Sequence, residues 1–246
     1  MPSRSETGHA RNVALFEELI TLIQGLGSAY QPSRSELQLS NLQPLAQQAR
    51  AAIAAVNASH PAYSLAVDAR ETAFAPLSKR LTRVLNALRA SGASPQVIES
   101  AKTLFRLLQG KRASAPATPP EGEPVPEGDP EIRSVSVSRM SYDSRLDNFD
   151  KLIRLLQNIP AYAPNEEELK TESLLQLYNE LSGLHAAVVA ASVPLNNARL
   201  ARNEVLYKPE TGMVPLALDA KTYIKSVFGA TSPQYRRVSG LRFMGY

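Results

Sequence analysis

The side chains that most often carry catalysis or bind metals are sparse in this sequence. Its three histidines are His9, His60 and His185, and none has a second His, Asp or Glu three or four residues further along the chain. Cysteine is absent, which excludes thiol catalysis, cysteine-ligated metals and disulfide bonds. The chain also lacks a phosphate-binding glycine loop, a zinc-protease helix motif and a serine elbow. We therefore expect a protein that is not an enzyme, with no metal and no cofactor, and no small-molecule substrate is indicated.

Two further polar features have a structural interpretation. Glu166, Glu167 and Glu168 lie at the predicted N-terminus of a helix, where the partial positive charge of the helix favours acidic side chains. His185 falls on the apolar stripe of a predicted helix, so we interpret it as a histidine at the edge of the core.

Basic residues give the best indication of binding. Residues 220–246 contain five bases and no acid, and aromatic side chains lie between those bases. Such a mixture suits phosphate backbones and exposed bases, although a basic helical face is often simply solvated. The candidate contacts with an anion or a nucleic acid are Lys221, Lys225, Arg236, Arg237 and Arg242, together with Lys79, Arg80 and Arg83 in the first half of the chain.

An acidic segment separates two basic halves. Residues 1–112 contain 13 bases and 7 acids, whereas residues 113–131 contain five acids, no base and six of the 18 prolines. A segment of this composition cannot offset its ordering entropy by burial. We therefore predict a disordered or polyproline-II linker over residues 113–133.

The two halves resemble each other. Ala29–Arg70 aligns without a gap to Ala161–Arg202, with identical residues at 14 of 42 positions. Similar segments flank this alignment: "FEELITLIQ" and "FDKLIRLLQ" before it, "GASPQ" and "GATSPQ" after it. The similarity predicts a tandem duplication. Arg70 and Arg202 are retained in both copies, and we interpret them as structural arginines, with anchors for an anion as the alternative.

The repeated phrases "AYQPSRSEL" and "AYAPNEEEL" predict a turn between two helices in each half. Ser33 and Asn165 are the predicted N-caps of the second helix, with Glu36 and Glu168 three residues later as in a capping box. A tyrosine in each phrase is expected to pack over the corner.

Prolines and glycines predict how the rest of each half is divided. Pro61 and Pro194 are expected to kink or break the second helix, so that a third helix follows. Gly92 and Gly229 are suitable helix ends, and a Ser-Pro pair then starts a short last helix.

These signals predict an all-α fold of two tandemly duplicated antiparallel bundles, each of about four helices. The predicted domains are 1–112, the first bundle, and 134–246, the second, joined by the Pro/Glu-rich linker.

Four segments of the second half resemble a family of uncharacterised bacterial helical proteins. They are "SYDSRLDNFDKLI", "PNEEEL", "NARLARNEVLY" and "LDAKTYIKSVFGATSPQYRRVSGLRF", and the similarity spans Ser141 to Phe243. The resemblance implies a shared fold. Because that family has no established activity, it transfers no catalytic residue.

Together these features predict a non-enzymatic interaction or scaffold protein that presents two homologous helical bundles. Its partner is expected to be another protein or a second copy of itself. The alternative is a nucleic-acid-binding, nucleoid-associated protein that uses the basic faces of the later helices. No apolar stretch has the length of a signal-peptide core or a membrane span, which predicts a cytoplasmic protein.

Overall fold

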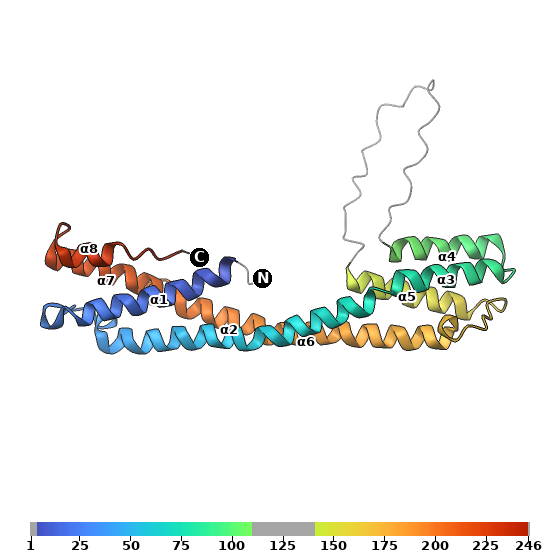
Figure 1. Cartoon of the computed structure of the whole chain (residues 1–246), viewed down its shortest axis with the longest axis horizontal. Helices are drawn as coiled ribbons and strands as arrows, with labels where there is room; N and C mark the ends of the chain where they lie inside the picture. Colours follow the sequence, from blue (N-terminus) through green and yellow to red (C-terminus); the bar gives the residue numbers. More distant parts are fainter. Residues whose placement is uncertain (1–3, 110–140, 246) are drawn as a thin grey trace, which may run out of the picture. The chain divides into compact units, whose positions relative to one another are not determined.

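The computed structural model describes residues 4–109 and 141–245, with side chains from Gly8 onward. Within these ranges the chain is helical and contains no strand, so the predicted all-α class is confirmed (Figure 1). The α-helices are α1 (Arg4–Gln24), α2 (Leu39–Phe74), α3 (Leu77–Ala90), α4 (Pro95–Leu108), α5 (Tyr142–Gln157), α6 (Thr171–Tyr207), α7 (Met213–Phe228) and α8 (Pro233–Ser239). None of the described helices is long and apolar enough to cross a membrane. The predicted linker, residues 113–133, lies outside the described residues.

The predicted helix end and the predicted start of the last helix are confirmed in each half. Gly229 follows α7 with a φ of +84°, and Gly92 follows α3 with a φ of +79°, a region that side chains with a Cβ rarely adopt. A Ser-Pro pair then starts α4 and α8, with the proline in the first turn, where its missing N–H costs nothing. In α8 the Ser232 hydroxyl accepts a hydrogen bond from the Tyr235 amide at 3.1 Å, as an N-cap does.

The predicted N-caps of the second helix are wrong. Instead of starting at Ser33 and Asn165, the helices α2 and α6 begin at Leu39 and Thr171. A short 3-10 turn occupies the intervening residues of each copy, Ser35–Leu37 and Glu167–Leu169, and neither turn has a side-chain cap. The residue after each turn is extended, and this residue separates the turn from the helix.

A tyrosine holds each repeated phrase in shape. The Tyr30 hydroxyl donates to the Leu37 carbonyl at 2.8 Å, and the Tyr162 hydroxyl donates to the Leu169 carbonyl at 2.7 Å. All four side chains are buried, so each hydrogen bond closes the phrase from within. The tyrosine therefore fixes the corner by a specific bond as well as by packing.

Prolines do not end the long helices. Pro61 lies inside the 36-residue α2, and Pro194 lies inside the 37-residue α6. The predicted break is therefore wrong at both positions, and no separate third helix turns back beside the second. Each long helix instead continues past its proline, to Phe74 in α2 and to Tyr207 in α6.

This continuity changes the predicted domains. The chain forms two compact units, but unit 1 comprises Met1–Leu65 with Ala190–Tyr246, and unit 2 comprises Ala66–Val189. The boundaries 1–112 and 134–246 are thus wrong, because each unit takes helices from both halves of the sequence. The chain passes between the units twice, inside α2 and inside α6.

The core of unit 1 combines the start of the chain with its end. Phe16, Leu19 and Ile23 of α1 are completely buried, as is Ala217 of α7. Leu206 near the end of α6 and Val238 of α8 belong to the same core. Figure 1 shows α1, α7 and α8 grouped together in this unit.

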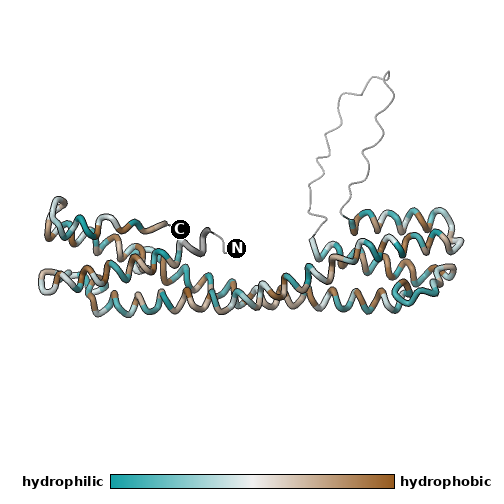
Figure 2. Tube along the Cα trace, viewed as in Figure 1, coloured by the Kyte–Doolittle hydropathy of each residue, from teal (hydrophilic) through white to brown (hydrophobic). Residues whose placement is uncertain are grey.

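The core of unit 2 combines the later helices of the first half with the first helices of the second half. Phe149 and Leu156 of α5 pack with Leu81 and Leu88 of α3, and Ala101 of α4 joins them. Figure 2 shows hydrophobic positions recurring between hydrophilic ones along the helices, as expected for amphipathic helices that share a core. Unit 2 is therefore assembled from α3, α4 and the end of α2 in the first half, with α5 and the start of α6 in the second.

The acidic segment does not separate the two units. It follows α4, which ends at Leu108, and precedes α5, which begins at Tyr142. Both residues belong to unit 2, and α4 packs against α5. The acidic segment therefore connects two helices of one unit.

Candidate functional site

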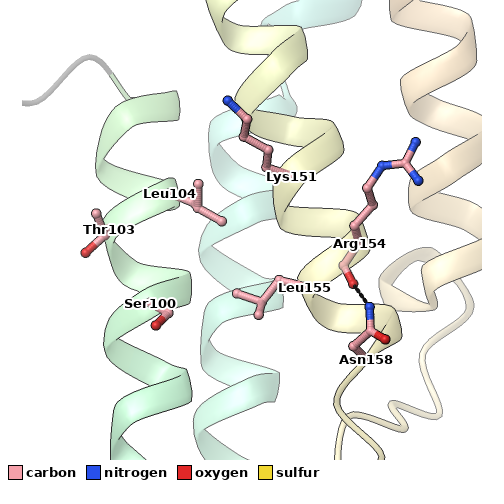
Figure 3. Close-up of a pocket in the computed structure, with 7 residues that line it drawn as sticks. All are labelled: Ser100, Thr103, Leu104, Lys151, Arg154, Leu155 and Asn158. Atoms are coloured by element: carbon pink, nitrogen blue, oxygen red, sulfur yellow. Dashed lines mark hydrogen bonds between the residues drawn. The ribbon is translucent and has the colours of Figure 1, made fainter.

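A groove lies between α4 and α5 in unit 2. Its volume is about 620 Å³, and its lining residues are Ser100, Thr103, Leu104, Lys151, Arg154, Leu155 and Asn158. Figure 3 shows Leu104 and Leu155 between the two helices, with Lys151 and Arg154 along α5. The groove therefore combines an apolar floor with one cation, Lys151, whereas the Arg154 side chain points away from α4.

Acidic residues one turn earlier pair with both of these cations. Lys151 Nζ lies 2.6 Å from an oxygen of Asp147, and Arg154 Nε lies 2.6 Å from an oxygen of Asp150. Both cations are more than half exposed, so solvent screens these i,i+4 pairs and they stabilise the helix only weakly. A ligand can compete with pairs of this strength.

Unit 1 has a smaller groove between α1 and α8. Its volume is about 340 Å³, and its lining residues are Thr21, Leu22, Gly25, Leu26, Pro233, Gln234, Arg237 and Val238. Leu22 and Leu26 are half-buried, and Arg237 is exposed. This groove also combines apolar side chains with a cation.

The two grooves occupy equivalent places. Leu22 and Leu155 hold the same position in the aligned segments "FEELITLIQ" and "FDKLIRLLQ", and Thr21 aligns with Arg154. The opposite walls, α8 and α4, both begin with Pro-Gln after a serine. Each groove therefore lies between the first helix of one half and the last helix of the other.

The structure changes the interpretation of Lys221. Its ammonium group donates to the Leu241 carbonyl at 2.6 Å and lies 5.9 Å from the centroid of the Phe243 ring. Burial lowers the pKa of this lysine. Lys221 thus holds the C-terminal segment against α7, which makes it a poor contact for an external ligand.

The other four cations near the C-terminus remain accessible. Lys225, Arg236, Arg237 and Arg242 are exposed, and none forms an ion pair with an acid of the described residues. Lys225 lies 5.8 Å from the centroid of the Tyr235 ring, which brings α7 and α8 together at this surface. Unit 1 therefore exposes four cations on α7, α8 and the segment after α8.

The predicted cations of the first half lie on α3, in unit 2. Arg83 forms an ion pair with Glu168, so one predicted contact pairs with one predicted cap residue. Lys79 is exposed and Arg80 is half-buried, without an acid partner in the described ranges. The two predicted basic groups are thus in different units.

Arg70 contacts residues near the start of α5. Its guanidinium carbon lies 3.7 Å from the centroid of the Tyr142 ring, and its Nη1 lies 3.3 Å from Nδ1 of His185. The other ring nitrogen of His185 lies 2.8 Å from an oxygen of Asp143. No acid pairs with Arg70 among the described residues: Glu17 pairs with Arg50, and Asp150 pairs with Arg154.

Arg202 has different surroundings in unit 1. It is only 3% exposed and donates to Oδ1 of Asn203 at 2.9 and 3.1 Å. Nearby in the same unit, His9 and Asn12 are also buried, and both contact the Tyr207 hydroxyl, at 2.6 and 3.1 Å. The two retained arginines therefore differ in exposure, although they align in the sequence.

The grooves and the surroundings of Arg70 were not predicted from the sequence. The alignment of Leu22 with Leu155 gave a partial indication of the grooves. Both residues are apolar and lie just outside the most regular apolar stripe of their helix. Their partner helices could not be assigned, since each partner comes from the other half of the chain.

Comparisons with known proteins returned no match: no family model, no curated protein and no solved structure is similar to this chain.

Proposed function

We propose that this chain is a non-enzymatic interaction or scaffold protein that offers two homologous grooves to a protein partner or to a second copy of itself. We further propose that the halves arose by duplication, since equivalent residues form the two Tyr–carbonyl hydrogen bonds and the two grooves. The observation that supports the proposal is the equivalence of the two grooves. A chain with two equivalent grooves can bind two sites on its partner.

Two linked sites raise affinity without any new contact. When one groove is occupied, the second binding step becomes intramolecular, at an effective concentration that can reach the millimolar range. The grooves offer apolar side chains beside cations, so the expected ligand is an amphipathic segment with acidic residues.

Charge reversal tests whether both grooves are used. Full-length protein with Arg237→Glu changes the groove of unit 1, and Lys151→Glu changes that of unit 2. Each single change should weaken recovery of a partner captured from the native cell, and the double change should abolish it, because avidity is lost.

Lys208→Glu is the matched control. Lys208 is 55% exposed and pairs with Glu204 at i,i+4, and Lys151 is 56% exposed and pairs with Asp147 in the same way. Equal recovery of the partner by the control and the double variant would contradict the proposal. Sedimentation of the same proteins tests self-association through the same surfaces.

Nucleic-acid binding is the second candidate, and the exposed cations Lys225, Arg236, Arg237 and Arg242 favour it. Binding driven by phosphates must weaken steeply with salt, by about two orders of magnitude between about 50 and 200 mM for four contacts. Titration of labelled DNA and RNA at these two concentrations checks this.

Variants then assign any such binding to these cations. Arg236→Gln with Arg242→Gln should weaken it and reduce its salt dependence, while Lys208→Gln should not. These changes avoid the groove residue Arg237, so the two candidate functions are tested separately. Absent or salt-insensitive binding would exclude the nucleic-acid function.

A further inference from the structure

Two arginines near the start of α5 have no acidic partner. Arg70 lies over the Tyr142 ring, and the guanidinium carbon of Arg145 lies 4.8 Å from the centroid of Phe74 and 5.8 Å from that of Tyr142. Phe74 and Tyr142 are themselves in edge contact, with centroids 4.8 Å apart. The two guanidinium groups thus share the Tyr142 ring, and no Asp or Glu of the described residues forms an ion pair with either.

Both arginines also have unused donors. The Nε atoms of Arg70 and Arg145 are buried and make no hydrogen bond within the described residues. Burial lowers the pKa of Arg145, because a charged group loses solvation there. Buried donors without acceptors are costly, so an acceptor at this position would stabilise the protein.

The neighbouring histidine does not supply that acceptor for both arginines. A guanidinium can only donate, so the Nδ1 of His185 accepts from Arg70, and its Nε2–H donates to Asp143 at 2.8 Å. Asp143 is the one carboxylate joined to this group in the described chain, and its side chain is 80% exposed. The carboxylate of Asp143 thus pairs with the histidine and with neither arginine.

In unit 1, the position equivalent to Arg145 forms hydrogen bonds with another part of the chain. Asn12 aligns with Arg145 and is completely buried. Its side chain donates to the Met244 carbonyl at 2.9 Å and accepts from the Met244 amide at 2.9 Å. Unit 2 offers Arg145 no such partner within the described residues.

We propose that Arg70 and Arg145, with Tyr142 and His185 between α2, α5 and α6, bind a phosphate-type oxyanion. Guanidinium groups pair with phosphate through two parallel N–H···O bonds, and two of them match the charge of a dianion. The N-terminus of α5, which begins at Tyr142, adds partial positive charge to the same place. The oxyanion is either free phosphate or the terminal group of a small phosphomonoester.

The wild-type protein tests the proposal without any substitution. Inorganic phosphate is titrated at fixed pH and ionic strength, and the ring-proton NMR signals of the histidines are followed. The His185 signal should shift and saturate, whereas the signal of His60, which is exposed on α2, should not. A His185 signal that never saturates, or that moves in parallel with His60, overturns the proposal.

Single substitutions locate the site. Arg70→Gln and Arg145→Gln should each weaken phosphate affinity about tenfold or more, which corresponds to the loss of charge-assisted hydrogen bonds. Arg154→Gln is the control on α5, because Arg154 is 71% exposed and paired with Asp150. Equal affinities in all three variants contradict the proposal, and should a variant not fold, the His185 titration decides alone.

Two further ligands define the chemical class. Tighter binding of glycerol 3-phosphate than of inorganic phosphate identifies a phosphomonoester, and equal or weaker binding identifies free phosphate. Acetate carries a single charge and should bind at least about tenfold more weakly. Acetate binding as strong as that of phosphate overturns the assignment to a phosphate-type anion.

Discussion

Tyr30 and Tyr162 show at the residue scale how one side chain specifies a repeated local shape. Each hydroxyl donates to a carbonyl seven residues later, and each ring is 7% exposed. The sequence indicated that the tyrosine belongs to the corner, but it could not reveal the hydrogen-bond acceptor. The acceptor follows from the 3-10 turn, which brings the Leu37 and Leu169 carbonyls to the hydroxyls.

These tyrosines predict how stability depends on pH. Burial raises the pKa of Tyr30 and of Tyr162 from 10.0 to about 12. Between pH 10 and 12 the unfolded chain loses the phenolic proton while the folded chain keeps it, so ionisation favours unfolding. The free energy of unfolding should fall by up to about 1.4 kcal/mol per pH unit for each tyrosine, with no such effect below pH 10.

Urea denaturation at pH 8 and at alkaline pH measures this dependence. Tyr162→Phe should cost about 1–2 kcal/mol at pH 8, because the Leu169 carbonyl loses its donor, and should reduce the alkaline loss of stability. Tyr63→Phe is the control, since the Tyr63 hydroxyl has no hydrogen-bond partner among the described residues. Equal stability of the two variants would contradict the role assigned to Tyr162.

Helix continuity decides the architecture at the scale of elements. A proline inside a helix removes one hydrogen bond and clashes with the preceding turn, which is why Pro61 and Pro194 predicted a break. Both helices nevertheless run on, so the cost of the proline is outweighed by the apolar residues that follow it, such as Phe74 and Leu206, which are buried.

Replacing these prolines tests the continuity. Pro61→Ala restores a backbone donor inside α2, so it should raise the free energy of unfolding by about 1–3 kcal/mol. Pro164→Ala lies outside a helix and should lower it by about 0.4–1 kcal/mol, because the unfolded chain gains freedom. Thermal or urea unfolding measures both changes, and a loss of stability in Pro61→Ala would contradict a continuous α2 in which the proline is unfavourable.

Reciprocal exchange of helices is the main feature at the scale of the whole molecule. Unit 1 joins α1 to α7 and α8, and unit 2 joins α5 to α3 and α4. Exchange of equivalent elements is usual between the protomers of swapped dimers, and here it takes place within one chain. A mutation in the first helix should therefore affect the last helices of the other half.

Hydrogen exchange measures where such a mutation acts. Phe16→Ala removes a fully buried ring and should destabilise unit 1 by about 3–5 kcal/mol. Amide exchange should accelerate in α7, Met213–Phe228, and remain slow in α3, Leu77–Ala90. Phe149→Ala is the reciprocal variant and should accelerate exchange in α3 while sparing α7. Faster exchange in α3 after Phe16→Ala would mean that each half closes its own core.

Local chemistry determined much of this protein from its sequence alone. The helical class, the similarity of the halves, and the starts of α4 and α8 depend on apolar spacing and on Pro and Gly near each element, so they were predictable. The tertiary structure decided which helices share a core, and so formed the grooves and the surroundings of Arg70. The sequence could not decide this, because both halves carry similar apolar stripes: packing α1 against helices of its own half or of the other half buries nearly the same side chains.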